Sequence, residues 1–318
     1  ILSGLVGSEM CIRDRDGAMI KPVITYTPNP AIDVWAQCER VILSEKTRID
    51  NVRTDPGGGG INVTRVLLAL GLPSHPIYLT GGATGTLFRT MLEQRDIHGT
   101  CIPIAGDTRI SEVVFETSNN HEYRFVAEGP VISEVEAAQA LAAIAQVEGD
   151  WIVASGSLPR GLPDTHYLEV ARIAHRNKMK IALDCSGPAL KAAGLSGHLD
   201  LLKISKRELS ELVDQPIETF EQLSTIAMDL IRSDRIQRLL VSMGPEGACL
   251  ADRDGVVHVP GQKIDVKSTV GAGDSFLGGF LYGLVTGADD RQALAMGIAA
   301  GSAACLRPGT QLVDKAQF

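Results

Sequence analysis

The segment Ser268-Thr269-Val270-Gly271-Ala272-Gly273-Asp274-Ser275 is the part of this sequence that most directly indicates its fold and chemistry. It precedes an apolar run that ends at Leu284 and predicts a helix over 275–284. The amides of Gly271, Ala272 and Gly273 are expected to point out of the helix N-terminus, where the helix dipole favours an anion. Asp274 is then a candidate base beside an anion site, a combination that phosphoryl transfer to a hydroxyl requires.

A simpler interpretation is a glycine turn in which Asp274 caps the helix. A second glycine cluster argues against it, because Gly57, Gly58, Gly59 and Gly60 stand just before Asn62 at the start of another expected helix. Successive glycines give up side-chain packing and lose conformational entropy on folding. The close approach of a ligand therefore explains them better than folding alone, and a mobile glycine loop is the alternative. We expect the loop and Asn62 to hydrogen-bond sugar hydroxyls.

Several common nucleotide and hydrolase motifs are absent from the sequence. No G-x-x-x-x-G-K-[ST] segment occurs, which excludes a P-loop NTPase. No G-x-G-x-x-G follows an expected strand with an acid beyond it, so a Rossmann dinucleotide site is not supported. Neither G-x-S-x-G nor H-E-x-x-H is present.

The composition indicates one large α/β domain, or one such domain with a small accessory. The chain has 318 residues, of which 44% are hydrophobic, and a formal net charge of −8. This charge argues against broad binding to nucleic acid or to an anionic membrane, although a local basic pocket can still hold a phosphorylated substrate. No apolar run approaches the roughly 20 residues that span a bilayer. The six cysteines form no C-x-x-C pair. These features predict a cytoplasmic protein with free thiols and no zinc site.

Residues 1–18 differ from the rest of the chain. They show no helix or strand period, and they end in the charged run Arg13-Asp14-Arg15-Asp16 before a natural start at Met19. No cationic segment precedes the short apolar stretch, which argues against a signal peptide. We interpret residues 1–18 as a non-native or disordered tail and residues 19–318 as a single domain.

After Met19, short β-rich runs alternate with segments of helical period. This alternation predicts a mostly parallel central sheet with helices on both faces. The expected strands are 23–26, 77–79, 151–154, 180–184, 201–204 and 238–242. The expected helices are 61–70, 86–94, 134–146, 164–176, 220–233, 275–284 and 291–306.

Two β-rich segments interrupt this rhythm. They are Asp33–Asp55 and Ile110–Val126, and the second contains a hairpin turn at Asn119-Asn120. Neither segment is large enough for its own core, so we expect them to form one small sheet over an edge of the main domain. Such a sheet could act as a lid that excludes water from a transfer site, or its apolar face could join two subunits into a homodimer.

With these motifs, residues 19–318 resemble the ribokinase-type family of sugar kinases, and within it the group of bacterial minor 6-phosphofructokinases. The resemblance covers essentially the whole chain after Met19. It is also carried by Asn29–Asp33, Gly81–Gly85, Ser155–Pro159 and Val241–Gly247. It implies a ribokinase-like α/β fold with a small β-sheet lid.

The resemblance also implies a role for each matching residue. Asp274 would take the proton from the acceptor hydroxyl, while Gly271, Ala272 and Gly273 would stabilise the transferred γ-phosphoryl group. Arg109 would pair with the phosphate that the sugar already carries, and a guanidinium can do this with two hydrogen bonds. The remaining residues implied to bind the sugar are Asp33, Gly57, Gly58, Gly59, Gly60, Asn62 and Ser157.

The implied partners are ATP and a sugar phosphate. Mg²⁺ would be carried mainly by ATP, and Glu208 would act on the ion through its coordination shell. The implied ATP-binding residues are Lys46, Lys203, Ser205, Ser242, Gly244, Gly247 and Ser302. A site for K⁺ would involve Ser268, Val270, Ala304 and Gly309. The family's N-x-x-E motif appears here with Ser205 in place of Asn, which loses an amide's paired donor and acceptor. Near the potassium site, Arg307 and Gln311 also differ from the nearest relatives.

The reaction implied is ATP-dependent phosphorylation of fructose 6-phosphate to fructose 1,6-bisphosphate, a step of glycolysis. Relatives that act on fructose 1-phosphate or tagatose 6-phosphate typically carry a lysine where this chain has Gly59. These two sugar phosphates remain alternative acceptors. An alternative of another class is a non-catalytic regulator that binds a sugar phosphate. Ser205 motivates that alternative, and the intact Gly271–Asp274 segment argues against it.

Overall fold

The computed structural model describes residues 20–313, so the expected tail at 1–18 lies outside the described residues. The helices are α1 (Gly59–Ala69), α2 (Gly82–Glu93), α3 (Glu134–Gln146), α4 (His166–Arg176), α5 (Gly187–Ala193), α6 (Lys206–Val213), α7 (Phe220–Arg232), α8 (Ala272–Val285) and α9 (Asp290–Cys305). The strands are β1 (Val23–Thr27), β2 (Ala31–Cys38), β3 (Asp50–Gly57), β4 (Ser74–Thr80), β5 (Thr100–Pro103), β6 (Arg109–Glu116), β7 (His121–Val126), β8 (Trp151–Ser155), β9 (Lys180–Asp184), β10 (Leu201–Ser205), β11 (Leu239–Ser242), β12 (Ala248–Asp252) and β13 (Gly255–Val259).

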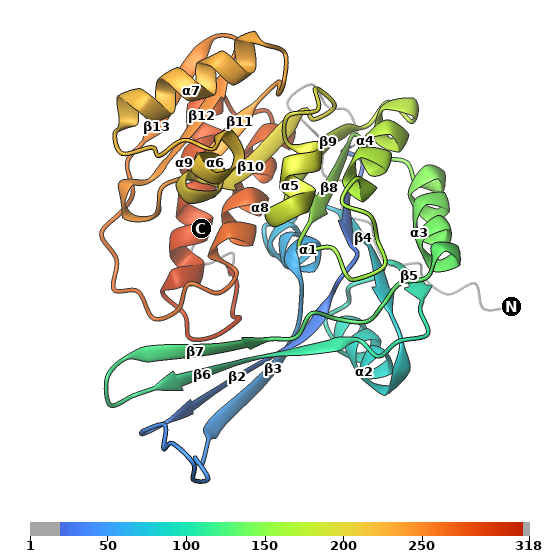
Figure 1. Cartoon of the computed structure of the whole chain (residues 1–318), viewed down its shortest axis with the longest axis vertical. Coiled ribbons are helices and arrows are strands. Elements are labelled where there is room, and N and C mark those ends of the chain that lie inside the picture. Colours follow the sequence, from blue (N-terminus) through green and yellow to red (C-terminus); the bar gives the residue numbers. More distant parts are fainter. Residues whose placement is uncertain (1–19, 314–318) are drawn as a thin grey trace, which may run out of the picture.

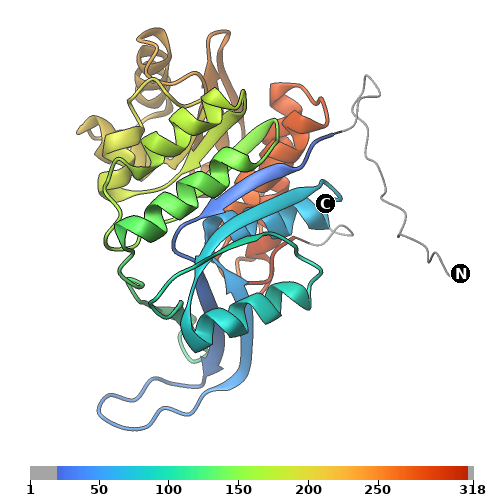
Figure 2. The same cartoon turned by 90° about the vertical axis from the view of Figure 1, so that its right-hand side faces the viewer.

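The main sheet has nine strands in the order β13-β12-β11-β10-β9-β8-β1-β4-β5. The strands from β11 to β5 pair in parallel, and β12 and β13 extend the sheet antiparallel at one edge. Figures 1 and 2 show helices on both faces of this sheet. Because parallel strands need crossover connections, the alternation of strands and helices in the sequence produces this layering.

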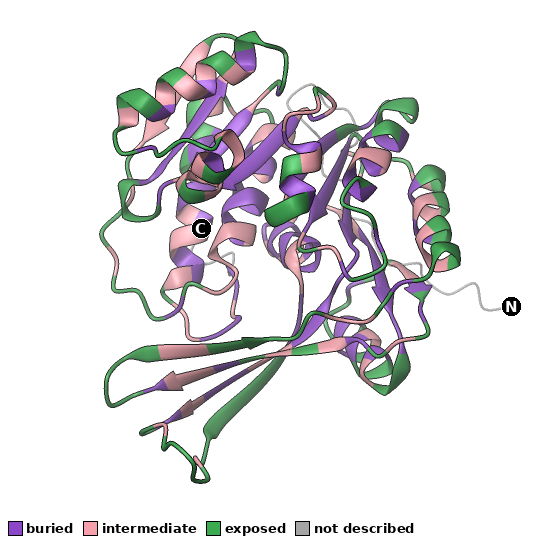
Figure 3. Ribbon diagram, in the orientation of Figure 1, coloured by how far each residue is buried: buried purple, intermediate pink, exposed green. Residues whose placement is uncertain are grey.

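Alternate residues of the central strands pack against the two helical layers. In β1, Val23 belongs to the cluster with α1, α8 and α9, whereas Ile24 and Tyr26 belong to the cluster with α3, α4, α5 and α7. Figure 3 shows the central strands buried along their length. A strand buried on both faces reads as a continuous apolar run, which explains why these strands were detectable in the sequence.

The second sheet has four strands in the order β3-β2-β6-β7 and projects away from the main body (Figures 1 and 2). Strand β6 pairs in parallel with β2 and antiparallel with β7, and the hairpin turn ends at Asn120 with a φ of 60°. The hairpin prediction is therefore confirmed. This sheet and its loops expose large apolar side chains: Ile42, Leu43, Ile49, Val52, Ile110, Phe125 and Val126.

The expected fold class is confirmed, with differences at some element boundaries. Helix α8 begins at Ala272 rather than 275, and α2 begins at Gly82 rather than 86. The strands β5, β12 and β13 and the short helices α5 and α6 were not predicted. The two helices have eight residues or fewer, too few for a clear helical period. Strands β5 and β13 are mostly half-buried or exposed, and β12 carries a single large aliphatic residue, so none of the three is a continuous apolar run. No helix within residues 20–313 is long and apolar enough to cross a bilayer.

Candidate active site

A cavity of about 320 Å³ lies where the carboxyl ends of β8 and β9 face the small sheet. Its walls combine residues from both sheets with the glycine loop before α1 and the glycine turn before α8. Of the predicted site residues, the cavity gathers Asp33, Gly58, Gly59, Asn62, Arg109, Ser157, Glu208, Val270, Gly271 and Asp274. Ligands of open parallel sheets bind at this end of the strands, so the topology agrees with the cavity.

Asp274 lies in the first turn of α8, and its carboxylate does not cap the helix. The helix cap is Gly271, with a φ of 70° and no side-chain cap. The interpretation of Asp274 as a capping residue is therefore wrong. Asn62 instead donates a hydrogen bond of 2.9 Å from Nδ2 to Oδ2 of Asp274. The first amides of α8 lack intrahelical acceptors, although the Ala272 amide makes a long contact of 3.4 Å with the Thr269 carbonyl.

The surroundings of Asp274 raise its pKa to about 6. Burial is the main cause, and the negative charge of Asp184 adds to it. The Asn62 hydrogen bond and the cations Lys203 and Arg65 act in the opposite direction. A carboxylate with a pKa of about 6 is ionised at neutral pH and still basic enough to accept a proton, as a general base requires.

Lys203 lies beneath the glycine turn rather than in the cavity wall. It is 7% exposed, and its Nζ donates to Oδ2 of Asp184 at 2.8 Å. Burial lowers the pKa of Lys203, but Asp184 outweighs it and the net direction is upward. A Cβ at Gly273 would stand 2.8 Å from this Nζ. The ammonium is therefore fixed directly under the anion site that the sequence predicts.

The glycine loop is tightly packed against protein atoms. A Cβ at Gly57 would lie 1.9 Å from Oδ2 of Asp33, and one at Gly59 would lie 2.1 Å from Oγ of Ser155. Gly58 has a φ of 106°, and a Cβ at Gly60 would meet Thr27 at 2.5 Å. Packing and backbone conformation therefore supply a reason for these glycines that the sequence argument did not consider. Gly58 and Gly59 nevertheless line the cavity.

Arg109 and Asp33 lie on the paired strands β6 and β2, and both line the small-sheet side of the cavity. The Arg109 guanidinium donates to the carbonyls of Ala127 at 2.9 Å and Asn29 at 3.0 Å, and its Nε has no hydrogen-bond partner among the described residues. Burial raises the pKa of Asp33 to about 7, against the lowering effect of Arg109. Two backbone carbonyls thus hold the guanidinium in place and leave it donors for an anion.

The departure at Ser205 has a local structural role. Ser205 caps α6, and its amide and hydroxyl both donate to Oε2 of Glu208 at 2.8 Å. The spacing Ser-x-x-Glu is that of a capping box, so the sequence already contained this signal. Ser205 pairs with Ser242 at the ends of β10 and β11, next to Gly244. Gly247 is buried, and its Cβ position lies 2.1 Å from the Val259 carbonyl.

Other predicted residues lie outside the cavity wall. Lys46 is exposed in the loop between β2 and β3. Ser302 lies one residue beyond Gly301, which packs against the start of α8. A direct contact of Lys46 or Ser302 with a bound nucleotide therefore remains a prediction.

Two residues of the expected potassium site, Ser268 and Ala304, lie where the segment before α8 meets the end of α9. The amide of Lys267 donates to the Cys305 carbonyl at 2.8 Å, which joins the segments of Ser268 and Ala304. Ser268 is 2% exposed. Gly309 has a φ of 69° and packs against Trp35, which explains the glycine without a cation.

Within residues 20–313, no group of three His, Cys, Asp or Glu side chains could hold a metal ion by itself. Glu208 and Asp184 line the cavity as separate carboxylates. Mg²⁺ usually keeps several waters and binds through one or two carboxylates plus substrate phosphates. These residues therefore fit a magnesium ion that enters with a nucleotide.

Sequence reasoning missed Asp184 and Arg124, which both line the cavity. Asp184 ends a strand of the parallel sheet, and this position is a signal that could have identified it. Arg124, on β7, donates to the hydroxyl of Thr269 at 2.8 Å and so connects the small sheet to the segment before α8. Only the folded chain shows this contact between the small sheet and the segment before α8.

Comparisons with known proteins give a matching family model and several similar proteins. Residues 24–316 match the model of the pfkB family carbohydrate kinases. A protein of Mycobacterium tuberculosis named ATP-dependent 6-phosphofructokinase isozyme 2 is 38% identical over 92% of this chain and 86% of its own length. A D-tagatose-1-phosphate kinase of Bacillus licheniformis is 31% identical over 92% of this chain and 95% of its own. The structure of phosphofructokinase-2 from Escherichia coli in complex with fructose-6-phosphate matches with a TM-score of 0.87 and 30% identity, covering 93% of this chain and 96% of that one.

Proposed function

The chain belongs to the pfkB family of carbohydrate kinases, and we propose that it transfers the γ-phosphoryl group of ATP to the 1-hydroxyl of fructose 6-phosphate. The products are fructose 1,6-bisphosphate and ADP. One observation carries the proposal. Asp274, with a pKa of about 6, stands at the helix N-terminus of α8 in a cavity that also contains Asp33, Asn62 and Arg109.

In the proposed mechanism, Asp274 accepts the proton of the acceptor hydroxyl, whose oxygen attacks the γ-phosphorus in line. Asn62 holds the Asp274 carboxylate through the hydrogen bond at 2.9 Å. The amides at Gly271 and Gly273 and the fixed Lys203 ammonium stabilise negative charge at the N-terminus of α8. The protein thus contributes positioning and charge stabilisation, which dominate catalysis of phosphoryl transfer.

The sugar phosphate is proposed to lie between the two sheets. Asp33 and Asn62 face its hydroxyls, with Ser157 and the glycine loop beside them. Arg109 takes the existing phosphate with donors that its two carbonyl contacts leave unused. The small sheet then covers the cavity as a lid and excludes water from the transfer.

The nucleotide is proposed to lie over the ends of β10 and β11, near Ser205, Ser242 and Gly244. Glu208 and Asp184 line the cavity and are the carboxylates that would hold a magnesium ion bound with ATP, and the ion would supply positive charge to offset that of the phosphates. A potassium ion beside Ser268 and Ala304 is part of the proposal. Equal turnover in KCl and NaCl would contradict this part of the proposal.

The choice of acceptor rests on Gly59. A side chain at this position would displace Ser155, since a Cβ would stand 2.1 Å from its hydroxyl. Because this chain has no lysine at this position, the phosphate-pairing role falls to Arg109, which favours fructose 6-phosphate. The similarity to a D-tagatose-1-phosphate kinase supports a second candidate, a tagatose phosphate as acceptor.

We also propose that the chain acts in the cytoplasm as a homodimer formed through the small sheet. The exposed apolar side chains of that sheet and its loops, Phe125 and Val126 among them, support such a contact. Sedimentation of the wild type and of Phe125→Ser tests this point. A monomeric wild type would contradict it.

ADP release tests the function directly. The purified chain receives Mg²⁺-ATP and one acceptor: fructose 6-phosphate, tagatose 6-phosphate, D-tagatose 1-phosphate or fructose 1-phosphate. We expect the highest kcat/KM with fructose 6-phosphate. Preference for another acceptor would keep the mechanism and overturn the substrate. If fructose 6-phosphate binds but ATP yields no ADP with any of the acceptors, the result would favour the non-catalytic regulator.

A further inference from the structure

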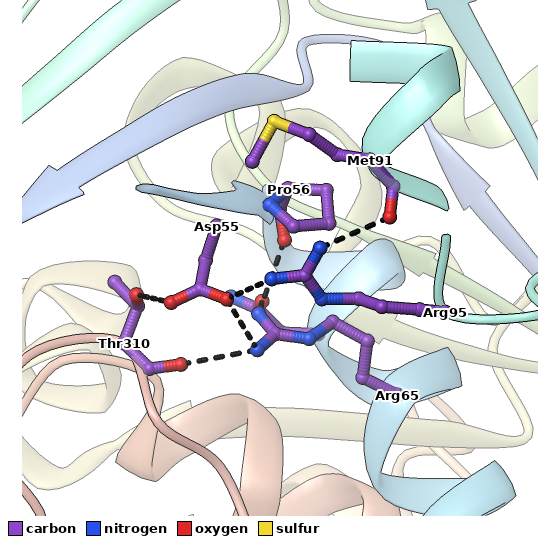
Figure 4. Close-up of polar contacts among 7 residues, drawn as sticks. Asp55, Pro56, Arg65, Met91, Arg95 and Thr310 are labelled. Atoms are coloured by element: carbon purple, nitrogen blue, oxygen red, sulfur yellow. Dashed lines mark hydrogen bonds and ion pairs between the residues drawn. The ribbon is translucent and has the colours of Figure 1, made fainter. Parts of the chain in front are cut away.

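A buried ionic cluster lies behind the glycine loop, and its residues have no role in the mechanism described above. Its centre is Asp55, which is 9% exposed. The Asp55 carboxylate accepts hydrogen bonds from Arg95 at 2.7 Å, from Arg65 at 3.4 Å and from the Thr310 hydroxyl at 2.6 Å (Figure 4). These residues come from the end of β3, from α1, from the segment after α2 and from the segment after α9.

Arg65 makes further hydrogen bonds besides the one with Asp55. Its Nη2 also donates to the Thr310 carbonyl at 3.3 Å, and its Nη1 donates to the Pro56 carbonyl at 3.1 Å (Figure 4). The same Nη1 lies 3.3 Å from Oδ1 of Asn62, three residues earlier on the same face of α1. One guanidinium therefore joins the base of the small sheet to the side chain that contacts Asp274.

The contact with Arg65 determines which way the Asn62 amide faces. A guanidinium only donates hydrogen bonds, so the amide oxygen must face Arg65. The amide nitrogen then faces the Asp274 carboxylate, to which it donates at 2.9 Å. The rotated amide would place its NH₂ against a cation and its oxygen against a carboxylate. Both contacts would be repulsive, so only one orientation satisfies the pair.

We propose that Arg65 is a positioning residue for phosphoryl transfer, because it holds Asn62 in the orientation that donates to Asp274. Asp55, Arg95 and Thr310 in turn hold the guanidinium of Arg65. The proposal rests on the proposed function, in which Asp274 is the base.

Several charged groups surround Asp274, and they determine the sign of the expected effect. Lys203 and Arg65 contribute positive charge, while Asp184 contributes negative charge. Asp33 lies close enough to interact with both Arg65 and Asp274. Loss of Arg65 removes one cation and releases the Asn62 donor. Both changes disfavour the ionised base, so the acidic limb of the pH–kcat profile moves to higher pH.

The test compares Arg65→Gln with the matched control Arg95→Gln. Both substitutions remove a cation from Asp55, and both are expected to lower Tm, but only Arg65 contacts Asn62. We expect Arg65→Gln to lower kcat by about 10- to 100-fold, the range for losing a hydrogen bond to a charged group, and to move the acidic limb upward. The acidic limb of the pH–kcat profile of Arg95→Gln should lie at the same pH as that of the wild type. Equal profiles for the two variants would show that the cluster only stabilises the fold.

A double-mutant cycle checks that Arg65 acts through Asn62. The effect of Arg65→Gln on kcat should largely vanish in the Asn62→Ala background, because coupled residues are not additive. Full additivity would overturn the proposal. If Arg65→Gln shows no cooperative melting, Arg65→Lys replaces it, since an ammonium cannot reach all four acceptors. A wild-type kcat in Asn62→Ala would also overturn the proposal, because Arg65 is argued to act through this amide.

The wild type separates this inference from the function on which it rests. If the wild type is active and Arg65→Gln has the same kcat and pH profile, only the role of Arg65 would be contradicted. A wild type that turns over none of the acceptors would remove both proposals.

Discussion

Nδ2 of Asn62 donates to Oδ2 of Asp274 at 2.9 Å, across a separation of 212 positions in the chain. The contact joins the helix that follows the glycine loop to the helix that follows the glycine turn. Both helices pack on the same face of the main sheet, where α1 and α8 share one apolar cluster. The two glycine segments therefore form one site because their helices are neighbours.

The pH dependence of turnover follows from the pKa of Asp274. Since that pKa is raised to about 6, the base is ionised above this value and protonated below it. We expect kcat to be constant near pH 8 and to fall about tenfold per pH unit below pH 6. Measuring kcat from pH 5 to 8 at saturating ATP and sugar phosphate checks this. A kcat that stays constant down to pH 5 would contradict the raised pKa of Asp274.

Asp33 should cost stability at neutral pH. Its folded-state pKa is about 7 and its ordinary value is 3.8, so between these values the folded chain keeps a proton that the unfolded chain has lost. Stability therefore declines as pH rises through this window. We expect Asp33→Asn to raise Tm at pH 8 by about 2–4 °C and to change it little at pH 4. An equal Tm change at both pH values would contradict the predicted titration.

The position of Asp33 should depend on Gly57. A Cβ there would stand 1.9 Å from Oδ2 of Asp33, so Gly57→Ala must displace the carboxylate. We expect KM for the sugar phosphate to rise by about 10-fold or more, since removing a hydrogen bond to a charged group has such an effect. The Asp33→Ala background is the control, because the alanine at 57 then meets no carboxylate. The same rise in KM in both backgrounds would refute this explanation.

Arg124 can act through its charge or through its contact with the Thr269 hydroxyl at 2.8 Å. Its side chain is 43% exposed and lies in the cavity wall, so we expect the charge to matter for a phosphorylated substrate. Arg124→Ala should raise KM for the sugar phosphate about tenfold, the effect of one charge-assisted hydrogen bond. Thr269→Val removes the contact and keeps the cation. Steady-state kinetics on both variants distinguish the two roles. An equal rise in KM in Arg124→Ala and Thr269→Val would indicate that Arg124 acts through its contact with Thr269 and not through its charge.

The layering of the fold could be predicted because strands buried on both faces are continuous apolar runs. The β12 and β13 hairpin could not, since β12 carries a single large aliphatic residue and β13 is only half-buried. The small sheet was predicted from two β-rich segments and the turn at Asn119-Asn120. Its strand order was not, because β2 pairs with β6 across about 80 residues of sequence.

The site shows the same division. Asp274 and the glycine segments are local patterns, and local patterns can be read from a sequence. The Arg65 contacts cannot, because Arg65 meets Thr310 across 245 positions. The reason for each glycine in the first loop also required the fold, which alone brings Asp33 and Ser155 beside that loop. The capping box at Ser205 and Glu208 was visible in the sequence and was overlooked.

The most direct test of the account is the turnover of Asp274→Asn with fructose 6-phosphate. Asparagine keeps the shape of the side chain and removes its basicity. We predict a fall in kcat on the order of 10²–10⁴, the range for a general base, with binding of fructose 6-phosphate retained in titration calorimetry. Near-normal turnover in a variant that binds the sugar phosphate would contradict the assignment of Asp274 as the base.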